Sequence, residues 1–292
     1  MEYRSSVLVD GLGFPEDPRW RGEQLWFSDM DAKAVMCVGL NADLEKVVEV
    51  AGTPSGLGWL PDGDLVVVSM QDRRLLQGKG TDLVERANLW DFASFHCNDM
   101  MVTGEGRAFI GNFGFDFEAM DPFAPGEIIT VSPDRSPKVA AEGLAFPNGI
   151  VTTPDEKTLI VSETLGERLT AFDIGADGEL TNRRTWADLK QMTPDGITMD
   201  VEGAVWVASP VSGGVFRVKE GGEITDVVRV ESQAYSCSLG GEDGRTLFMT
   251  TSDPLPQLFE IMNIEMTPES ERKEFGGRIE YCEVEFPGLG RP

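Results

Sequence analysis

Six short segments of the chain carry a polar residue at the same place, and these residues are the strongest candidates for chemistry. The segments are FPEDPRW, TPSGLGW, HCNDMMV, FPNGIVT, TPDGITM and AYSCSLG, and their third residues are, in order, Glu16, Ser55, Asn98, Asn148, Asp195 and Ser236. In four of the six segments the preceding residue is proline. Each residue alone has an ordinary explanation as a turn residue. Their recurrence at one position indicates a polar ring.

Two carboxylates and two amides in such a ring are suitable ligands for a hard divalent cation. Glu16 and Asp195 would supply negative charge, and Asn98 and Asn148 would supply neutral carbonyl oxygens. Burying two carboxylates near an axis without a cation would be costly. We therefore predict that these four residues bind a metal ion, with water-facing turn residues as the alternative. Calcium is favoured, although the donors also suit magnesium or manganese.

The elements that must hold these residues repeat along the chain. Each segment is followed by an alternating apolar stretch, and the intervals between successive stretches are 40 to 51 residues. The stretches begin near Gln24, Asp64, Arg107, Thr158, Ala204 and Thr246. Each interval has room for a four-stranded unit, and helical periodicity is almost absent. The pattern predicts an all-β fold, a six-bladed β-propeller in which the polar segments lead into the innermost strands.

The two ends of the chain are both strand-like. YRSSVLVD and RIEYCEVEF are expected to complete one blade between them and so close the ring. The prediction is a single propeller domain over residues 1–292. Ala187–Met192 and Thr267–Phe275 are expected to be loops or short turns rather than parts of a second domain.

Beyond the polar ring, few residues suggest chemistry. His96 is the only histidine, which excludes a histidine-rich zinc site. It precedes Asn98 by two residues, so in an extended strand it would share a face with Asn98 and contact substrate or shuttle a proton; a hydrogen-bonded wall residue is the alternative. The longest insertion, Gly111–Glu127, is rich in phenylalanine. As a lid it would place Phe113 and Phe115 against the substrate, and as a packing loop it would cover the third blade.

The charge balance argues against two classes of partner. The chain has 25 Lys and Arg residues against 50 Asp and Glu residues, a net charge of −25, which repels nucleic acid and anionic membrane surfaces. The amino terminus has no secretion signal, and no apolar stretch approaches the length of a membrane span. Four widely spaced cysteines without a CxxC pair fit free thiols in a reducing compartment. We expect a cytoplasmic protein, and nothing in the sequence indicates its oligomeric state.

The same residues carry a resemblance to a known family. FPEDPRW, NDMMVTGEGRAFIGN, FPNGIVTTPDEKTLIVSET and PDGITMDVEGAVWVA resemble motifs of the regucalcin, senescence-marker-protein and gluconolactonase family of six-bladed propeller lactonases. The resemblance covers essentially the whole chain. It implies that Glu16, Asn148 and Asp195 are metal ligands, and that Asn98 completes the shell or contacts substrate. It also widens the choice of metal to zinc and iron(II).

Two positions depart from the family pattern. Members that act on sugar lactones often carry arginine two residues before the asparagine, where this chain has His96. Some relatives bind a second, structural calcium through an acidic residue three positions after the ligand aspartate, where this chain has Thr198. No second site of that kind is predicted.

Together these observations predict a divalent-metal-dependent hydrolase that opens a small-molecule lactone ring. Asp195 is the expected general base, and Asn98 would orient the substrate or stabilise the oxyanion. His96 and the Gly111–Glu127 loop would select the substrate. Two alternatives stay open. One is a phosphotriesterase of the diisopropylfluorophosphatase type with Asp195 as nucleophile; the other is a non-catalytic propeller that binds calcium or a protein partner.

Overall fold

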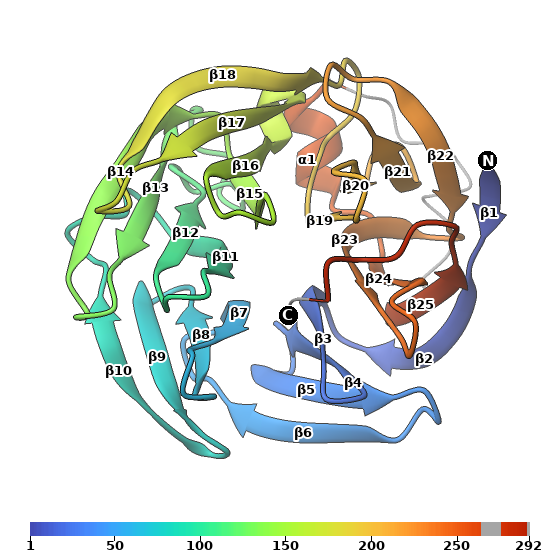
Figure 1. Cartoon of the computed structure of the whole chain (residues 1–292), viewed down its shortest axis with the longest axis horizontal. Helices are drawn as coiled ribbons and strands as arrows, with labels where there is room; N and C mark the ends of the chain where they lie inside the picture. The colour runs from blue at the N-terminus through green and yellow to red at the C-terminus, as the bar shows by residue number, and fades with distance from the viewer. Residues whose placement is uncertain (264–275, 291–292) are drawn as a thin grey trace.

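Six antiparallel sheets are arranged as blades around a central axis (Figure 1). The computed structural model describes residues 1–263 and 276–290. The strands of the first three blades, from the axis outwards, are β3 (Pro15–Arg21), β4 (Gln24–Asp29), β5 (Ala34–Gly39) and β6 (Leu44–Glu49); β7 (Pro54–Trp59), β8 (Leu65–Ser69), β9 (Arg74–Lys79) and β10 (Asp82–Asn88); and β11 (Cys97–Val102), β12 (Ala108–Asn112), β13 (Gly126–Val131) and β14 (Pro137–Leu144).

The fourth, fifth and sixth blades follow the same plan. Their strands, again from the axis outwards, are β15 (Pro147–Thr152), β16 (Thr158–Glu163), β17 (Arg168–Ile174) and β18 (Leu180–Asp188); β19 (Ile197–Met199), β20 (Val205–Ser209), β21 (Gly214–Val218) and β22 (Ile224–Arg229); and β23 (Gln233–Gly240), β24 (Thr246–Ser252), β25 (Gly277–Glu283) and β2 (Ser6–Leu12). The predicted six-bladed propeller is confirmed.

The two ends of the chain close the ring together. Strand β2, from the amino-terminal end, pairs antiparallel with β25, from the carboxy-terminal end. This is the shared blade that the sequence predicts. The predicted strand YRSSVLVD is divided in the structure, and Tyr3 and Arg4 belong to a separate strand in the neighbouring blade. Strand β1 (Glu2–Arg4) pairs in parallel with β22 and makes the fifth blade five-stranded.

The hydrophobic core lies between neighbouring blades. Every residue of β8, β12 and β20 is buried, because these strands are covered on both faces, whereas the outermost strands β6 and β10 expose much of their length. Val66 and Val68 of the second blade belong to one apolar cluster with Met100 and Ile110 of the third. Radial stacking therefore accounts for the repeated apolar stretches.

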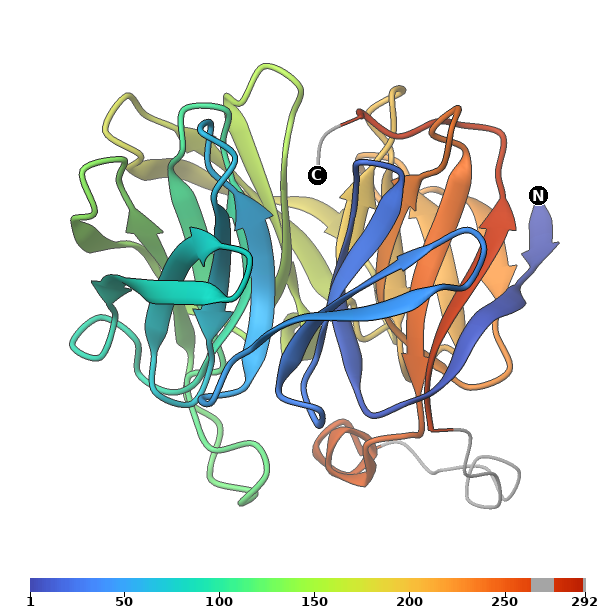
Figure 2. The same cartoon turned by 90° about the horizontal axis from the view of Figure 1, so that it is seen from below.

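Loops and short helices gather at one end of the ring. Figure 2 shows α1 (Pro256–Ile261) and the loop between β12 and β13 on the same side of the molecule, with the carboxy-terminal segment on the other side. A 3₁₀ turn, η1 (Thr164–Gly166), follows β16. No helix within residues 1–263 and 276–290 is long and apolar enough to cross a membrane.

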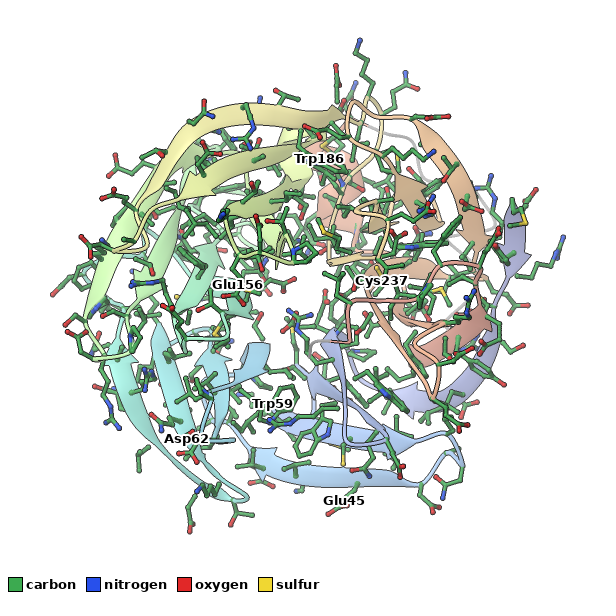
Figure 3. All side chains as sticks on the ribbon, in the orientation of Figure 1. Glu45, Trp59, Asp62, Glu156, Trp186 and Cys237 are labelled. Carbon is green, nitrogen blue, oxygen red and sulfur yellow. The ribbon has the colours of Figure 1, made fainter. Side chains whose placement is uncertain are left out.

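The remaining sequence predictions concern loops, cysteines and charge. Ala187–Met192 forms the end of β18 and the turn after it, whereas Thr267–Phe275 lies outside the described residues. The cysteines are buried and free, as predicted, and Figure 3 shows Cys237 toward the inside of the ring. Glu45 and Asp62 are exposed toward the periphery (Figure 3), so part of the excess acid lies on a solvated surface.

Candidate active site

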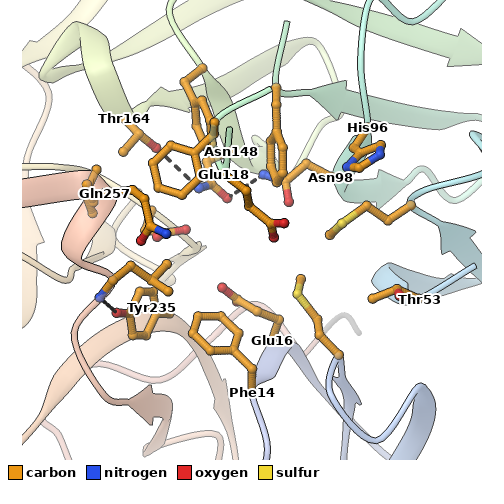
Figure 4. Close-up of a pocket in the computed structure, with 18 of the residues that line it drawn as sticks. Phe14, Glu16, Thr53, His96, Asn98, Glu118, Asn148, Thr164, Tyr235 and Gln257 are labelled. Atoms are coloured by element: carbon orange, nitrogen blue, oxygen red, sulfur yellow. Dashed lines mark hydrogen bonds between the residues drawn. The ribbon is translucent and has the colours of Figure 1, made fainter. Parts of the chain in front are cut away.

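Four residues of the polar column meet at a pocket at one end of the central channel. Glu16, Asn98, Asn148 and Asp195 line a cavity of about 450 Å³ (Figure 4). We call these four side chains the ligand layer. Each lies at or just before the start of the innermost strand of its blade. The two column serines, Ser55 and Ser236, are buried and do not line the cavity.

The innermost strands are bulged where they carry the column. The pairing register shifts between Glu16 and Arg19 in β3 and between Cys97 and Met100 in β11, and similar shifts occur in β7, β15 and β23. A bulge breaks the alternation of side chains between the two faces of a strand. Consecutive residues of one strand are therefore buried together at the axis.

A chain of hydrogen bonds holds the two amides across four blades. Ser55 Oγ donates to Asn98 Oδ1 at 3.3 Å, and Asn98 Nδ2 donates to Asn148 Oδ1 at 3.1 Å. Asn148 Nδ2 donates to Thr164 Oγ1 at 3.3 Å, and this hydroxyl donates to the Pro194 carbonyl at 2.9 Å. Each amide oxygen thus accepts one hydrogen bond and keeps a second lone pair. These contacts fix how the amides face the pocket.

The two carboxylates of the ligand layer are buried without a neighbouring cation. Glu16 and Asp195 are each 6% exposed, and neither forms an ion pair with any described lysine or arginine. Burial raises the pKa of Glu16 well above its ordinary value, and repulsion from Asp195 and Asp99 adds to the rise. The pKa of Asp195 is raised in the same way by burial and by Asp99. Asp195 Oδ1 is buried and has no hydrogen-bond partner.

A second acidic pair lies next to the ligand layer, because Asp17 follows Glu16 in β3 and Asp99 follows Asn98 in β11. Asp17 and Asp99 are buried, and the guanidinium of Arg19 lies 2.6 Å from Asp17 Oδ1. Arg19 also donates to the Met100 carbonyl at 2.8 Å, and the Leu57 backbone N–H donates to Asp17 Oδ2 at 2.5 Å. We call Asp17, Arg19 and Asp99 the arginine layer. It ties the first blade to the second and third at the axis.

Sequence reasoning did not find the arginine layer, although a signal for it exists. The residues that follow the column are, in order, Asp17, Gly56, Asp99, Gly149, Gly196 and Cys237. The glycines are required by space. A Cβ atom on Gly149 would lie 2.5 Å from the Ile197 nitrogen, and one on Gly196 would lie 1.9 Å from Ser236 Oγ. In five of the six blades the residue directly after the polar column is aspartate or glycine, and this recurrence is the sequence signal for a second ring next to the polar ring.

The ligand layer fits a hard divalent cation. Within the described parts of the chain, no group of three or more His, Cys, Asp or Glu side chains is placed to hold a metal ion. The ligand layer instead offers two carboxylates and two amide oxygens, which is the oxygen-rich chemistry that calcium and magnesium use. The unpartnered Asp195 Oδ1 and the absence of a cation beside Glu16 both match the needs of such an ion.

The predicted substrate-contacting residues lie at different depths. His96 and Phe113 line the pocket, and Phe113 stacks on Phe146 with ring centroids 4.6 Å apart. Phe115 does not line it; this ring packs behind the wall, 6.1 Å from Phe146. Burial and the nearby Arg73 lower the pKa of His96, so this imidazole is neutral at pH 7.

Several pocket residues come from positions that no sequence pattern singled out. Thr53 and Phe146 line the cavity with φ of +68° and +62°, in the left-handed region that such residues rarely adopt. Strained backbone of this kind tends to persist at functional sites. The lining also includes Tyr235, whose hydroxyl donates to the Asp253 carbonyl at 2.7 Å, and Leu258 of α1, which belongs to one apolar cluster with Phe146.

Both the sequence and the fold of this chain are similar to those of regucalcins. Regucalcin of Xenopus laevis is 31% identical over 161 residues, which are 53% of this chain and 54% of that protein, so the match spans about half the length of that relative. A calcium-binding regucalcin from Agrobacterium tumefaciens has a similar structure, with a TM-score of 0.82, 19% identity and coverage of 100% of this chain and 98% of that one.

A second solved structure is similar at a lower score. It is a gluconolactonase from Xanthomonas campestris, with a TM-score of 0.72, 21% identity and coverage of 95% of this chain and 89% of that one. At these identities the solved structures show a common fold. The model of the SMP-30/gluconolactonase/LRE-like region matches residues 14–253, which contain the whole ligand layer. The chain therefore belongs to the SMP-30/gluconolactonase/LRE-like family.

Proposed function

We propose that this protein is a divalent-metal-dependent lactonase. The observation that carries the proposal is the buried pair Glu16 and Asp195, which forms no ion pair with a lysine or arginine of the described residues and shares the floor of a pocket with two amides. Membership of a family that includes gluconolactonases supports a lactone as the substrate. Calcium is the favoured metal, since the donors are all oxygens and a structural neighbour is described as a calcium-binding regucalcin.

Glu16, Asn98, Asn148 and Asp195 would hold the cation. When bound, the cation would polarise the ester carbonyl and make water a better nucleophile. Asp195 would accept the proton of the attacking water, because its Oδ1 has no hydrogen-bond partner.

Asn98 would orient the substrate from the third blade. Its amide nitrogen already donates to Asn148 Oδ1, so it is held at the pocket surface by a fixed neighbour. An amide donor placed there would stabilise negative charge that develops on the carbonyl oxygen of the substrate. His96, neutral at pH 7, would contact the substrate from the wall rather than add charge.

Proton release in a weakly buffered solution tests the proposal. Chelated protein is assayed against a panel of sugar, aliphatic and aromatic lactones, with calcium, magnesium, manganese, zinc or iron(II) added back singly. We expect metal-restored hydrolysis, and we expect Asp195→Asn and Glu16→Gln each to lower kcat/KM by about 1,000-fold or more while the fold is retained. Glu45→Gln is a matched control, since this carboxylate is exposed on an outer strand. Full activity in both site variants would refute the metal-centred mechanism.

Two other results would redirect the proposal. Metal-dependent turnover of fluorophosphates but of no lactone would indicate the phosphotriesterase chemistry that the same ligand set permits. Tight calcium binding without turnover of any ester would indicate a binding propeller, which the similarity to regucalcins favours as the second candidate.

A further inference from the structure

The polarity of the pocket changes with depth. Its floor is the polar ligand layer, and Asp31, Lys33, Gln71 and Glu118 are exposed and form the rim, while Gln257 of α1 lines the pocket and is half-buried. Between floor and rim the lining is mostly apolar. The apolar lining residues are Phe14, Met30, Met70, Phe113, Phe117, Phe146, Leu165, Leu255 and Leu258.

One wall of the pocket is a cluster of aromatic and aliphatic side chains. Phe113 and Phe117 from the β12–β13 loop pack on Phe146, with ring centroids 4.6 and 5.6 Å away. Leu258 of α1 and Leu165 after β16 belong to the same cluster. Three blades contribute to this wall, so its shape is set by packing between insertions.

Two hydroxyl groups of the pocket lining, those of Thr164 and Tyr235, are already engaged in hydrogen bonds. Thr164 Oγ1 accepts from Asn148 and donates to the Pro194 carbonyl. Tyr235 donates its hydroxyl to the Asp253 carbonyl and accepts from the Leu255 N–H at 3.1 Å, so this residue offers the pocket its ring. Thr53, His96 and Gln257 are the other polar side chains of the lining that lie outside the ligand layer and are not exposed.

This lining disfavours a substrate with many hydroxyl groups. A hydroxyl group that leaves water without gaining a hydrogen bond loses binding affinity, whereas each methylene group buried against such a wall increases it. The exposed groups at the rim stay hydrated and gain little from binding hydroxyls. A cavity of about 450 Å³ has room for a lactone ring with a substituent.

We propose that the substrate is a lactone that carries an alkyl chain or an aromatic ring, held by the wall of Phe113, Phe117 and Phe146 while its ring lies over the ligand layer. This inference rests on the proposed lactonase function and names its substrate class. Phe113 and Phe117 are the specificity-determining residues, and they act on the substituent rather than on the reacting atoms.

The test compares matched lactones in the metal-loaded protein. We expect kcat/KM for a phenyl- or pentyl-substituted δ-valerolactone to exceed that for unsubstituted δ-valerolactone, and for glucono-1,5-lactone, by about tenfold or more. Phe113→Ala should remove about tenfold from the substituted lactone and change the unsubstituted one less than about twofold. Phe117→Ala tests the same wall from a second position, with folding of both variants checked by circular dichroism.

Phe123→Ala is the matched control. This ring lies in the same loop, is 55% exposed and does not line the pocket, so neither substrate should be affected. Preference of the wild type for glucono-1,5-lactone, or equal losses on both δ-valerolactones in the wall variants, would overturn the inference.

A binding measurement separates this inference from the lactonase proposal. A phenyl-substituted δ-valerolactam cannot be hydrolysed at the rate of a lactone, and calorimetry reports its binding without any turnover. We expect the substituted lactam to bind about tenfold more tightly than the parent lactam, and Phe113→Ala to abolish the difference. If no lactone is hydrolysed but this difference holds, the lactonase proposal fails and the apolar ligand class stands. If lactones are hydrolysed and the lactams bind equally, the ligand class fails alone.

Discussion

The ligand layer and the arginine layer each contain a pair of buried carboxylates, Glu16 with Asp195 and Asp17 with Asp99, and the two pairs differ in their source of positive charge. Arg19 opposes the rise in pKa that burial causes at Asp17 and Asp99. Among the residues that the structure describes, no lysine or arginine opposes the rise in pKa at Glu16 and Asp195. One pair has an arginine of the chain beside it, and the other has no lysine or arginine from residues 1–263 and 276–290 within ion-pair distance.

This difference indicates that one buried acidic pair helps to hold the blades together, whereas the other is available to bind an ion at the pocket. A buried carboxylate needs a partner, and the arginine layer has one that also bonds the backbone of the third blade. The ligand layer keeps an unpartnered carboxylate oxygen at the surface of a pocket. A bound ion would therefore stabilise the ligand layer, whereas the arginine layer needs none.

The largest effect is expected from removal of the internal cation. Arg19→Met should lower the free energy of unfolding by about 3–5 kcal/mol, because it leaves Asp17 and Asp99 buried without positive charge. Denaturant unfolding of chelated protein measures the loss. Lys46→Met, which breaks an exposed pair with Glu49, should cost less than about 1 kcal/mol. A loss of stability in Arg19→Met as small as that in Lys46→Met would mean that Arg19 does not compensate the charge of Asp17 and Asp99.

The ligand layer should respond to a metal where the arginine layer does not. Calcium at 100 times its Kd should raise the free energy of unfolding by about 2.7 kcal/mol. Glu16→Gln should abolish this gain and leave the chelated protein at least as stable as wild type, because it removes an unpaired buried acid. Unfolding curves with and without calcium measure both, with Glu45→Gln as the control that keeps the gain. An undiminished gain in Glu16→Gln would place the ion elsewhere.

Without metal, the acids should make stability depend on pH. Burial raises the pKa of Asp99 to about 6, so its folded form holds a proton that the unfolded chain has released. Stability should therefore fall as pH rises from about 4 to about 6, with a slope near 1.4 kcal/mol per pH unit for each such group. Glu16 and Asp195 shift in the same direction, and calcium should reduce their share. Thermal unfolding across this range measures the slope, and Asp99→Asn should reduce it.

The smallest effect is expected from a serine that supports the ligand layer. Ser55→Ala removes the hydrogen bond to Asn98 Oδ1 and should cost about 1 kcal/mol of stability and about tenfold in calcium affinity. Ser236→Ala is the matched control from the same column, since its buried hydroxyl has no hydrogen-bond partner. Calorimetric titration with calcium compares the two. Equal losses of calcium affinity in Ser55→Ala and Ser236→Ala would show that the hydrogen bond from Ser55 to Asn98 does not support calcium binding.

Much of the fold and part of the site could be predicted from local pattern. Strands such as Leu65–Ser69 repeat at blade-sized intervals, and the segments before them carry Glu16, Asn98, Asn148 and Asp195 at one position. The repeat is visible in the sequence because every blade packs against its neighbours in the same way and so needs the same residue pattern. The metal, the substrate and the roles of these four residues remain predictions.

Other features could not be predicted from the sequence because they depend on strand bulges and on contacts between distant segments rather than on local pattern. Alternation places Glu16 and Asp17 on opposite faces of a strand, and only the bulge in β3 buries both at the axis. The parallel pairing of β1 with β22 joins residues more than 200 positions apart and leaves no periodic trace. Phe115 looks equivalent to Phe113 along the chain, yet only Phe113 reaches the pocket.

The sequence by itself thus determined the number of blades, the closure of the ring by its two ends and the polar column, because these follow from repeated short-range patterns. Only the tertiary structure decided that Arg19 lies beside Asp17 and Asp99 of the arginine layer rather than beside the carboxylates of the ligand layer. It also decided that segments from three blades build an apolar wall next to the ligand layer. Charge balance and pocket shape depend on side chains brought together from distant segments, and their positions are set by bulges and insertions rather than by the repeat.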